Sequence, residues 1–181
     1  MIIKELLKGD SVRLATFSDD NVKTLNNWYC DSEFLRYYDY LPAFPKSEFQ
    51  LIEMIKDVRK SNDMYIFAIR EKLNDKLIGV CGFENIIWNN GTSNIYIGLG
   101  DKEYRGKGMA KEALSLAIDF GFMELNFHRI QLSVISYNNA AISLYEKLGF
   151  IREGVMREFV CRDNKRFDLY TYGLLRREWV K

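Results

Sequence analysis

The chain has 181 residues, of which 48% are hydrophobic and 28% are charged, and its formal net charge is +1. This length and apolar content suit a sizeable core, and we expect residues 1–181 to form a single domain. The near balance of 26 basic and 25 acidic residues argues against a surface built for nucleic acid or a membrane. No apolar run is long enough to cross a bilayer, and residues 1–5 do not resemble a signal peptide.

The cysteines and the histidine bear on redox setting and metal binding. The chain has three cysteines, Cys30, Cys81 and Cys161, and a single histidine, His128. An odd number of cysteines without CxxC spacing does not make a disulfide framework, and one histidine beside them is no plausible metal site. We therefore expect no metal ion and a reducing, cytoplasmic setting.

Patterns of apolar residues predict the elements in chain order. Residues 11–17 alternate as a strand, with Val12, Leu14 and, as a further candidate, Ala15 turned inward, and residues 18–20 predict a helix cap. A helix follows on the spacing of Phe49, Ile52, Ile55 and Val58. The remaining expected elements are strands at 64–69, 77–83, 94–99 and 129–135, helices at 109–124 and 138–148, and terminal strands at 155–161 and 167–175. This order predicts a mixed α/β sheet with helices on both faces.

A basic turn with two glycines lies between the strand at 94–99 and the helix that starts at Met109. Gly106 and Gly108 let the backbone approach an anion closely, and Arg105 and Lys107 add positive charge. The start of a helix also presents free N–H groups and the positive end of its dipole. The turn therefore predicts a phosphate or pyrophosphate site.

Two familiar phosphate loops do not fit this turn. A Walker loop requires Ser or Thr after its lysine, and Lys107 is followed by Gly108. The dinucleotide fingerprint requires a third glycine where the chain has Lys111.

A second informative segment covers residues 138–150. Asn138 or Asn139 can cap a helix, and Gly149 can take the left-handed conformation that ends it. One face of this helix carries apolar residues at helical spacing, namely Ala141, Leu144, Tyr145 and Leu148. On spacing alone, Tyr145 is a core aromatic residue.

Together the two segments resemble the Gcn5-related N-acetyltransferases, and the likeness covers about residues 11–175. The turn resembles the coenzyme A pyrophosphate pattern Arg/Gln-x-x-Gly-x-Gly/Ala, with Arg105, Gly108 and Ala110 in its key places. Residues 138–150 are similar to the family's late helix, Asn-x-x-Ala-x-x-Leu-Tyr-x-x-x-Gly-Phe. The loop at 104–108 and a Glu153-Gly154 turn resemble in particular the branch with ribosomal-protein N-terminal and spermidine acetyltransferases.

The resemblance implies a GNAT-like fold, with a mostly antiparallel sheet, a splayed parallel strand pair and helices on both faces. It also implies transfer of an acetyl group from acetyl-coenzyme A to a primary amine by direct attack. The pantetheine arm would lie between the strands at 94–99 and 129–135, along the main chain of Ile97 and Leu99, whose side chains remain in the core. The pyrophosphate would be bound by Arg105, Gly106, Lys107, Gly108, Met109 and Ala110. Asn138 is either a further cofactor contact or only a helix cap.

The same resemblance implies catalytic roles. Tyr145 matches the tyrosine proposed as general acid for the leaving thiolate, and its reference pKa of about 10 lies near that of an alkyl thiol. Backbone N–H groups near Leu99 would polarise the thioester. Many relatives carry a glutamate base where this chain has Asn94, which cannot take a proton. Glu84 is the best remaining carboxylate, with a solvated loop acid as the alternative reading, and His128 lies away from the expected gap.

The sequence says least about the identity of the amine acceptor. In this family an aromatic-rich early region forms the acceptor wall, here Trp28, Tyr29, Phe34, Tyr37, Tyr38, Tyr40 and Phe44. Most of these rings are packing residues. The acids among them, Asp31, Glu33 and Asp39, would attract a cationic amine. The expected partners are acetyl-coenzyme A and an amine acceptor, and a homodimer stays open. A peptide N-terminus, a polyamine and an aminated antibiotic are not distinguished.

Parts of the sequence are also compatible with two other classes of function. A non-catalytic acyl-coenzyme A binding module is disfavoured by Tyr145 and slightly favoured by Asn94. A nucleic-acid-binding domain would use Arg157, Arg162, Lys165, Arg166, Arg176 and Arg177. Acidic residues interrupt that series, so a solvated surface of mixed charge is the better interpretation.

Overall fold

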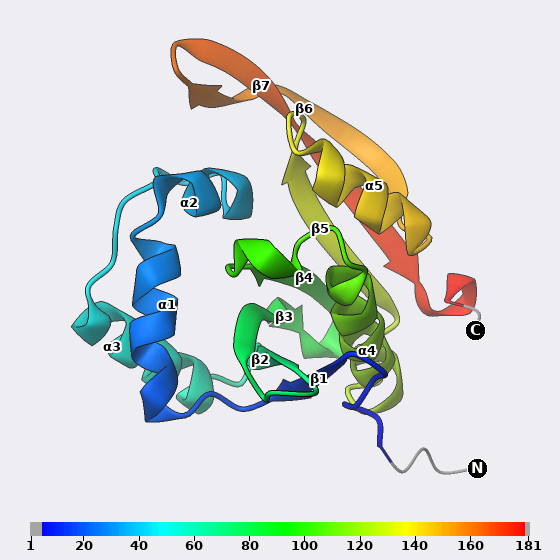
Figure 1. Ribbon diagram of the computed structural model, residues 1–181. Coiled ribbons are helices and arrows are strands. Elements are labelled where there is room, and N and C mark those ends of the chain that lie inside the picture. Colours follow the sequence, from blue (N-terminus) through cyan, green and yellow to red (C-terminus); the bar gives the residue numbers. More distant parts are fainter. Residues whose placement is uncertain (1–4, 180–181) are drawn as a thin grey trace.

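The computed structural model describes residues 5–179, so residues 1–4 of the segment tested for a signal peptide lie outside it. One seven-stranded sheet runs through the molecule in the order β1-β2-β3-β4-β5-β7-β6 (Figure 1). The strands are β1 (Val12–Ala15), β2 (Tyr65–Glu71), β3 (Leu77–Ile87), β4 (Thr92–Leu99), β5 (Arg129–Ile135), β6 (Ile151–Arg162) and β7 (Lys165–Leu175). Every neighbouring pair is antiparallel except β4 and β5, which are parallel. The predicted fold class is confirmed.

Helices cover both faces of this sheet. They are α1 (Val22–Tyr29), α2 (Ser32–Tyr38), α3 (Glu48–Lys60), α4 (Met109–Met123) and α5 (Asn139–Lys147). In Figure 1, α1 to α3 lie on one side of the sheet and α4 and α5 on the other. Side chains cap the N-termini of two of these helices. The Asp31 side chain accepts hydrogen bonds from backbone N–H groups in the first turn of α2, and Ser47 and Gln50 form a capping box on α3. Within residues 5–179, no helix is long and apolar enough to span a membrane.

The core has two main layers, one on each side of the sheet. One cluster joins the sheet to α4 and α5 and includes Phe83, Ile118 and Tyr145. The other joins the sheet to α1, α2 and α3 and includes Trp28 and Val80. Because side chains alternate along a strand, neighbouring residues of β3 contribute to different layers.

The parallel strands β4 and β5 separate after a short contact. They pair at Thr92 with Arg129, at Ser93 with Ile130 and at Asn94 with Gln131. Both strands continue beyond this point, to Leu99 and to Ile135, without pairing to each other. At the fork, the Gln131 Nε2 atom donates a hydrogen bond of 3.0 Å to the Asn94 Oδ1 atom. The splayed pair expected from the family resemblance is therefore present.

Several local predictions differ from the structure. The strand predicted at 77–83 continues to Ile87, so Glu84 lies inside β3 and does not enter a loop. β6 begins at Ile151, because Ile151, Arg152 and Gly154 pair with β7. Glu153 lies in the strand where its register shifts, so Glu153 and Gly154 do not form a turn. The buried face of α3 is Leu51, Ile55 and Val58, whereas Phe49 and Ile52 are exposed.

The early region also differs in detail. The helix cap predicted at residues 18–20 lies just before α1, but the extent of α1 and the presence of α2 were not predicted, since aromatic residues mask a simple apolar period. Val12 and Leu14 are buried as expected, while Ala15 is half-buried. The turn before α1 was expected to cap the helix through a side chain of residues 18–20. Instead, the side chain of the later residue Asn21 accepts a hydrogen bond of 3.0 Å from the Ser18 backbone N–H.

Candidate active site

The basic turn between β4 and α4 has an open backbone. Gly106 and Gly108 have φ angles of +76° and +81°, and a Cβ atom built on either would meet no other atom within 4 Å. Gly108 is the N-cap residue of α4, and no side chain caps that helix. The first N–H groups of α4 are therefore available to an anion.

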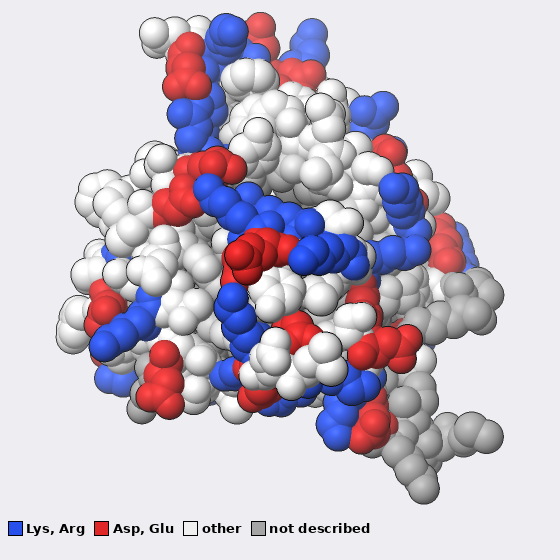
Figure 2. Space-filling view, viewed as in Figure 1, with Lys and Arg blue, Asp and Glu red and all other residues white. Residues whose placement is uncertain are grey.

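Positive charge surrounds this turn. Lys102, Arg105 and Lys107 are exposed, and a band of Lys and Arg side chains crosses the middle of the face shown in Figure 2, with acidic side chains along its edges. The Arg105 Nε atom donates to the Leu99 carbonyl oxygen at 3.1 Å. The Lys107 Nζ atom lies 5.6 Å from the centre of the Tyr104 ring.

Two acids expected to attract the acceptor are instead paired with this turn. The Lys102 Nζ atom lies 2.8 Å from a Glu33 carboxylate oxygen and 3.2 Å from an Asp31 oxygen. Arg105 Nη1 lies 3.6 Å from the other Glu33 oxygen. Asp31 also accepts from the first turn of α2. These contacts make both residues neighbours of the proposed pyrophosphate site.

Ile97, Leu99 and Asn138, three of the residues expected to contact the cofactor, lie on β4 and just before α5. Ile97 and Leu99 are half-buried, and their side chains pack against the core on the α4 side. Asn138 caps α5 by accepting from the Ala141 N–H at 3.2 Å, and its Nδ2 atom donates to the Tyr37 carbonyl oxygen at 3.1 Å. Of its two alternatives, the cap is present in the structure.

Tyr145 lies on α5, on the same side of the sheet as α4. Its side chain is 7% exposed, and its ring meets Phe150 edge-on with the ring centres 5.9 Å apart. Burial raises the pKa of the Tyr145 phenol to about 12. The hydroxyl group therefore stays protonated at neutral pH, which is the state a proton donor requires, but it is a weaker acid than a free phenol and its pKa lies further from that of an alkyl thiol.

Glu84 lies on the opposite side of the sheet. It is four residues from Val80, which packs with α1 to α3, so both face that layer. Glu84 pairs directly with Asn94 of β4, which places the two side chains next to each other across the strands. Burial, and next the charge of Asp39, raise the pKa of the Glu84 carboxyl. A raised pKa makes the carboxylate a better base near neutral pH.

Aromatic side chains pack directly on the end of β4. A Cβ atom on Gly100 would lie 1.9 Å from the Trp28 ring, and one on Gly98 would lie 2.7 Å from Tyr38. The two glycines therefore let the wall of α1 and α2 touch the strand backbone. Sequence reasoning missed this role, although two glycines two residues apart, one within β4 and one just after it, are a usable signal.

The histidine and the cysteines do not form part of the candidate site. His128 is exposed just before β5, at the closed end of the fork. Among the described residues, Cys30, Cys81 and Cys161 are free thiols, and no group of three or more metal-binding side chains was found.

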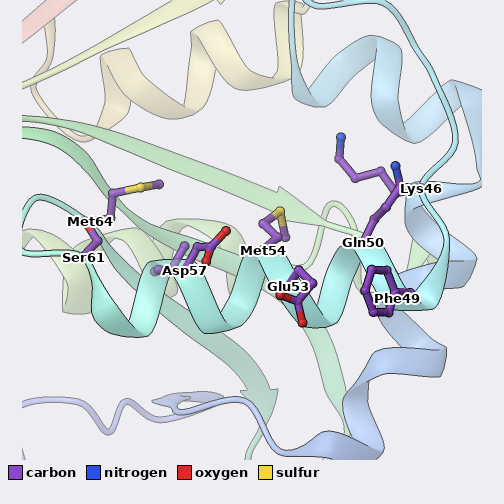
Figure 3. Close-up of a pocket in the computed structure, with 9 residues that line it drawn as sticks. Lys46, Phe49, Gln50, Glu53, Met54, Asp57, Ser61 and Met64 are labelled. Atoms are coloured by element: carbon purple, nitrogen blue, oxygen red, sulfur yellow. The ribbon is translucent and has the colours of Figure 1, made fainter.

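A separate open pocket runs along α3 (Figure 3). Its lining includes Lys46, Phe49, Glu53, Asp57 and Met64. Met54 of the same pocket packs with the core layer that contains Tyr38 and Tyr96. The pocket therefore borders the side of the sheet that α1, α2 and α3 cover.

The fold and the turn define a class of protein in which a parallel strand pair opens beside a basic helix N-terminus. The family profile described as "Acetyltransferase (GNAT) domain" matches residues 11–151. The chain belongs to this family and is an N-acetyltransferase.

Similar proteins agree with this assignment. The chain is 32% identical to an N-acetyltransferase called p20 from Bacillus licheniformis, over 97% of this chain and 99% of that protein. It is 25% identical to the [ribosomal protein uS5]-alanine N-acetyltransferase of Escherichia coli, over 99% of this chain and 90% of the other. A crystal structure of spermidine N-acetyltransferase from Vibrio cholerae with CoA and spermine shares the fold. Its TM-score is 0.87 at 22% identity, covering 96% of this chain and 100% of that one.

Proposed function

We propose that the enzyme transfers the acetyl group of acetyl-coenzyme A to a primary amine, by direct attack in a ternary complex. One observation carries this proposal: β4 and β5 stop pairing after Asn94 and Gln131, and the open end of the fork lies beside the glycine turn. Main-chain groups of β4 near Ile97 and Leu99 would pair with the pantetheine arm. The turn at 105–110 would bind the pyrophosphate through helix N–H groups and Arg105.

The two proposed catalytic groups suit a reaction across the sheet. Tyr145 belongs to the layer of α4 and α5, and Glu84 faces the layer of α1 to α3. The acetyl donor would therefore reach the gap from one side and the amine from the other.

The proposed step moves two protons. The amine nitrogen attacks the thioester carbon, so a C–N bond forms and the C–S bond breaks. Before the attack, Glu84 takes one proton from the cationic amine through water, which frees the nitrogen lone pair. The Tyr145 hydroxyl gives its proton to the departing sulfur, and the second proton released by the nitrogen returns to Tyr145 through water. Backbone N–H groups near Leu99 stabilise the negative charge that develops on the carbonyl oxygen.

The acceptor proposed is a cationic primary amine. Asp31 and Glu33 are paired with Lys102, so Asp39 and Glu84 remain of the acids considered for acceptor binding and catalysis. The relatives named for a ribosomal-protein alanine and for spermidine supply the two acceptor types to compare.

The test is turnover of acetyl-coenzyme A against an amine panel, read by thiol release. The panel contains spermidine, a peptide with an N-terminal alanine and an aminoglycoside, and mass spectrometry locates the acetyl group on the product. We expect turnover with at least one amine and a large loss in Tyr145→Phe. Tight binding of coenzyme A by calorimetry without turnover for any amine would instead identify a non-catalytic binding module.

A further inference from the structure

We propose that Arg162 is a positioning residue for acetyl transfer, holding residues 39–41 so that Asp39 stays beside Glu84. This role rests on the proposed function, because it assigns Glu84 to the acceptor site. Arg162 is the last residue of β6, at the tip of the hairpin that projects beyond the rest of the sheet in Figure 1.

The guanidinium group of Arg162 holds two carbonyl groups of the segment that follows α2. Its Nη2 atom donates to the Leu41 carbonyl oxygen at 2.8 Å and to the Asp39 carbonyl oxygen at 3.3 Å. The sequence separation is more than one hundred residues, so this contact joins two distant parts of the chain. The guanidinium group is planar, and its N–H groups point in fixed directions, so it can donate to two carbonyl oxygens at once. The ammonium group of lysine rotates and does not fix these directions.

Neighbouring contacts strengthen the same junction. The Tyr40 ring meets the Phe159 ring edge-on, with ring centres 5.7 Å apart. Arg36 Nη1 donates to an Asp163 carboxylate oxygen at 3.1 Å. The hairpin tip therefore holds the end of α2 and the residues after it from one side.

A second element, the segment between β5 and α5, also holds these residues. The Tyr137 hydroxyl donates to the Arg36 carbonyl oxygen, and Asn138 donates to the Tyr37 carbonyl oxygen. Both donors lie between β5 and α5, at the open end of the fork. Residues 36–41 therefore bridge the pantetheine gap and the β6–β7 hairpin.

The position of Arg162 has a cost as well as a gain. Its Nε atom is buried and has no hydrogen-bond partner among the described residues. A buried donor without a partner is unfavourable, and such groups in native proteins call for a specific reason. Holding the two carbonyl groups is the reason that the geometry provides.

The held segment carries a charge that acts on Glu84. Asp39 ends α2 in an extended conformation, and its Oδ1 atom accepts from the Leu41 N–H at 3.0 Å. The negative charge of Asp39 helps to raise the pKa of Glu84. The other titratable groups that face Glu84 are Tyr38 from α2 and Tyr96 from β4. Both are neutral at physiological pH because burial raises the pKa of each phenol.

The experiment compares Arg162→Ala and Arg162→Lys with Arg166→Ala, an exposed arginine on the same hairpin. Each enzyme is assayed for kcat and KM across pH with the best amine of the panel, and for coenzyme A affinity by calorimetry. For Arg162→Ala we expect the acceptor KM to rise about tenfold and the acidic limb of kcat/KM to move to lower pH. Coenzyme A affinity and the Arg166→Ala profile should match the wild type.

Further comparisons separate positioning from folding. Asp39→Asn should move the pH limb in the same direction, and Arg162→Ala should add no further pH shift to it, because both changes remove one interaction. Arg162→Lys keeps the charge and should still raise the KM, which covers the case in which the alanine variant does not fold. Unchanged KM and pH profile in the Arg162 variants would overturn the positioning role. An equal loss of acceptor and coenzyme A binding would also overturn it, as a purely structural effect. Absence of turnover by the wild-type enzyme with every amine would overturn the proposed function itself.

Discussion

The glycine turn gives the sharpest test of where coenzyme A binds, through Gly108→Ala and Gly108→Val. Gly108 has a φ of +81° and caps α4, so a side chain there would project where the pyrophosphate is expected. The protein itself has room, since a Cβ atom at this position meets no other atom within 4 Å. Any loss of affinity beyond backbone strain must therefore come from the ligand.

The two effects have different magnitudes. A left-handed backbone costs an ordinary residue about 1–2 kcal/mol, which for a chain of this size lowers Tm by about 2–8 °C. A hydrogen bond to a charged group contributes about 1.5–3 kcal/mol. Keeping the pyrophosphate from one or two helix N–H groups should therefore cost about 3 kcal/mol, or about 150-fold in Kd.

Calorimetry with coenzyme A measures the affinity, and thermal unfolding shows that each variant is folded. Gly149→Ala is the matched control, because Gly149 has a φ of +91° and its added Cβ atom makes only an ordinary 3.8 Å contact with Leu174. That control should lose similar stability and keep its affinity. A folded Gly108→Val variant with wild-type affinity for coenzyme A would refute the placement of the pyrophosphate.

Three further predictions concern the acid, the base and the turn. Tyr145→Phe should lower kcat by about 10²–10⁴ with little change in coenzyme A affinity, and wild-type turnover would return Tyr145 to a packing role. Folding raises the pKa of the Glu84 carboxyl group, so ionisation of this group lowers the free energy of unfolding. The loss of stability begins as the pH rises past the unfolded-state pKa of about 4.3 and is complete above the folded-state pKa. Glu84→Gln should therefore lower kcat/KM at neutral pH. The variant should also be more stable than the wild type at pH 7, and this difference should disappear below about pH 4. A variant with the same Tm as the wild type at pH 7 would contradict this prediction. Glu33→Gln should release Arg105 and tighten coenzyme A binding by a few fold at low salt, and weaker binding would count against it.

Local features of the candidate active site could be predicted from the sequence, because they depend on residues close together in the chain. The glycine turn, the cap at Asn138 and the left-handed Gly149 are all present where expected. Each is set by backbone conformation and by hydrogen bonds within a few residues. The order of strands and helices followed for the same reason, although ends such as Ile87 of β3 were displaced by pairing with a neighbouring strand.

Only the tertiary structure decided which side chains meet. It placed Glu84 opposite Asn94, paired Asp31 and Glu33 with Lys102, and brought Arg162 to the end of α2. These contacts join residues far apart in the chain, and strand register and helix packing set them. Apolar periodicity shows which face of an element is buried but does not show which charged side chain lies opposite it. For that reason the proposed donor site could be predicted from one short segment. The proposed acceptor site, which combines β3, β4, the end of α2 and the β6–β7 hairpin, could not.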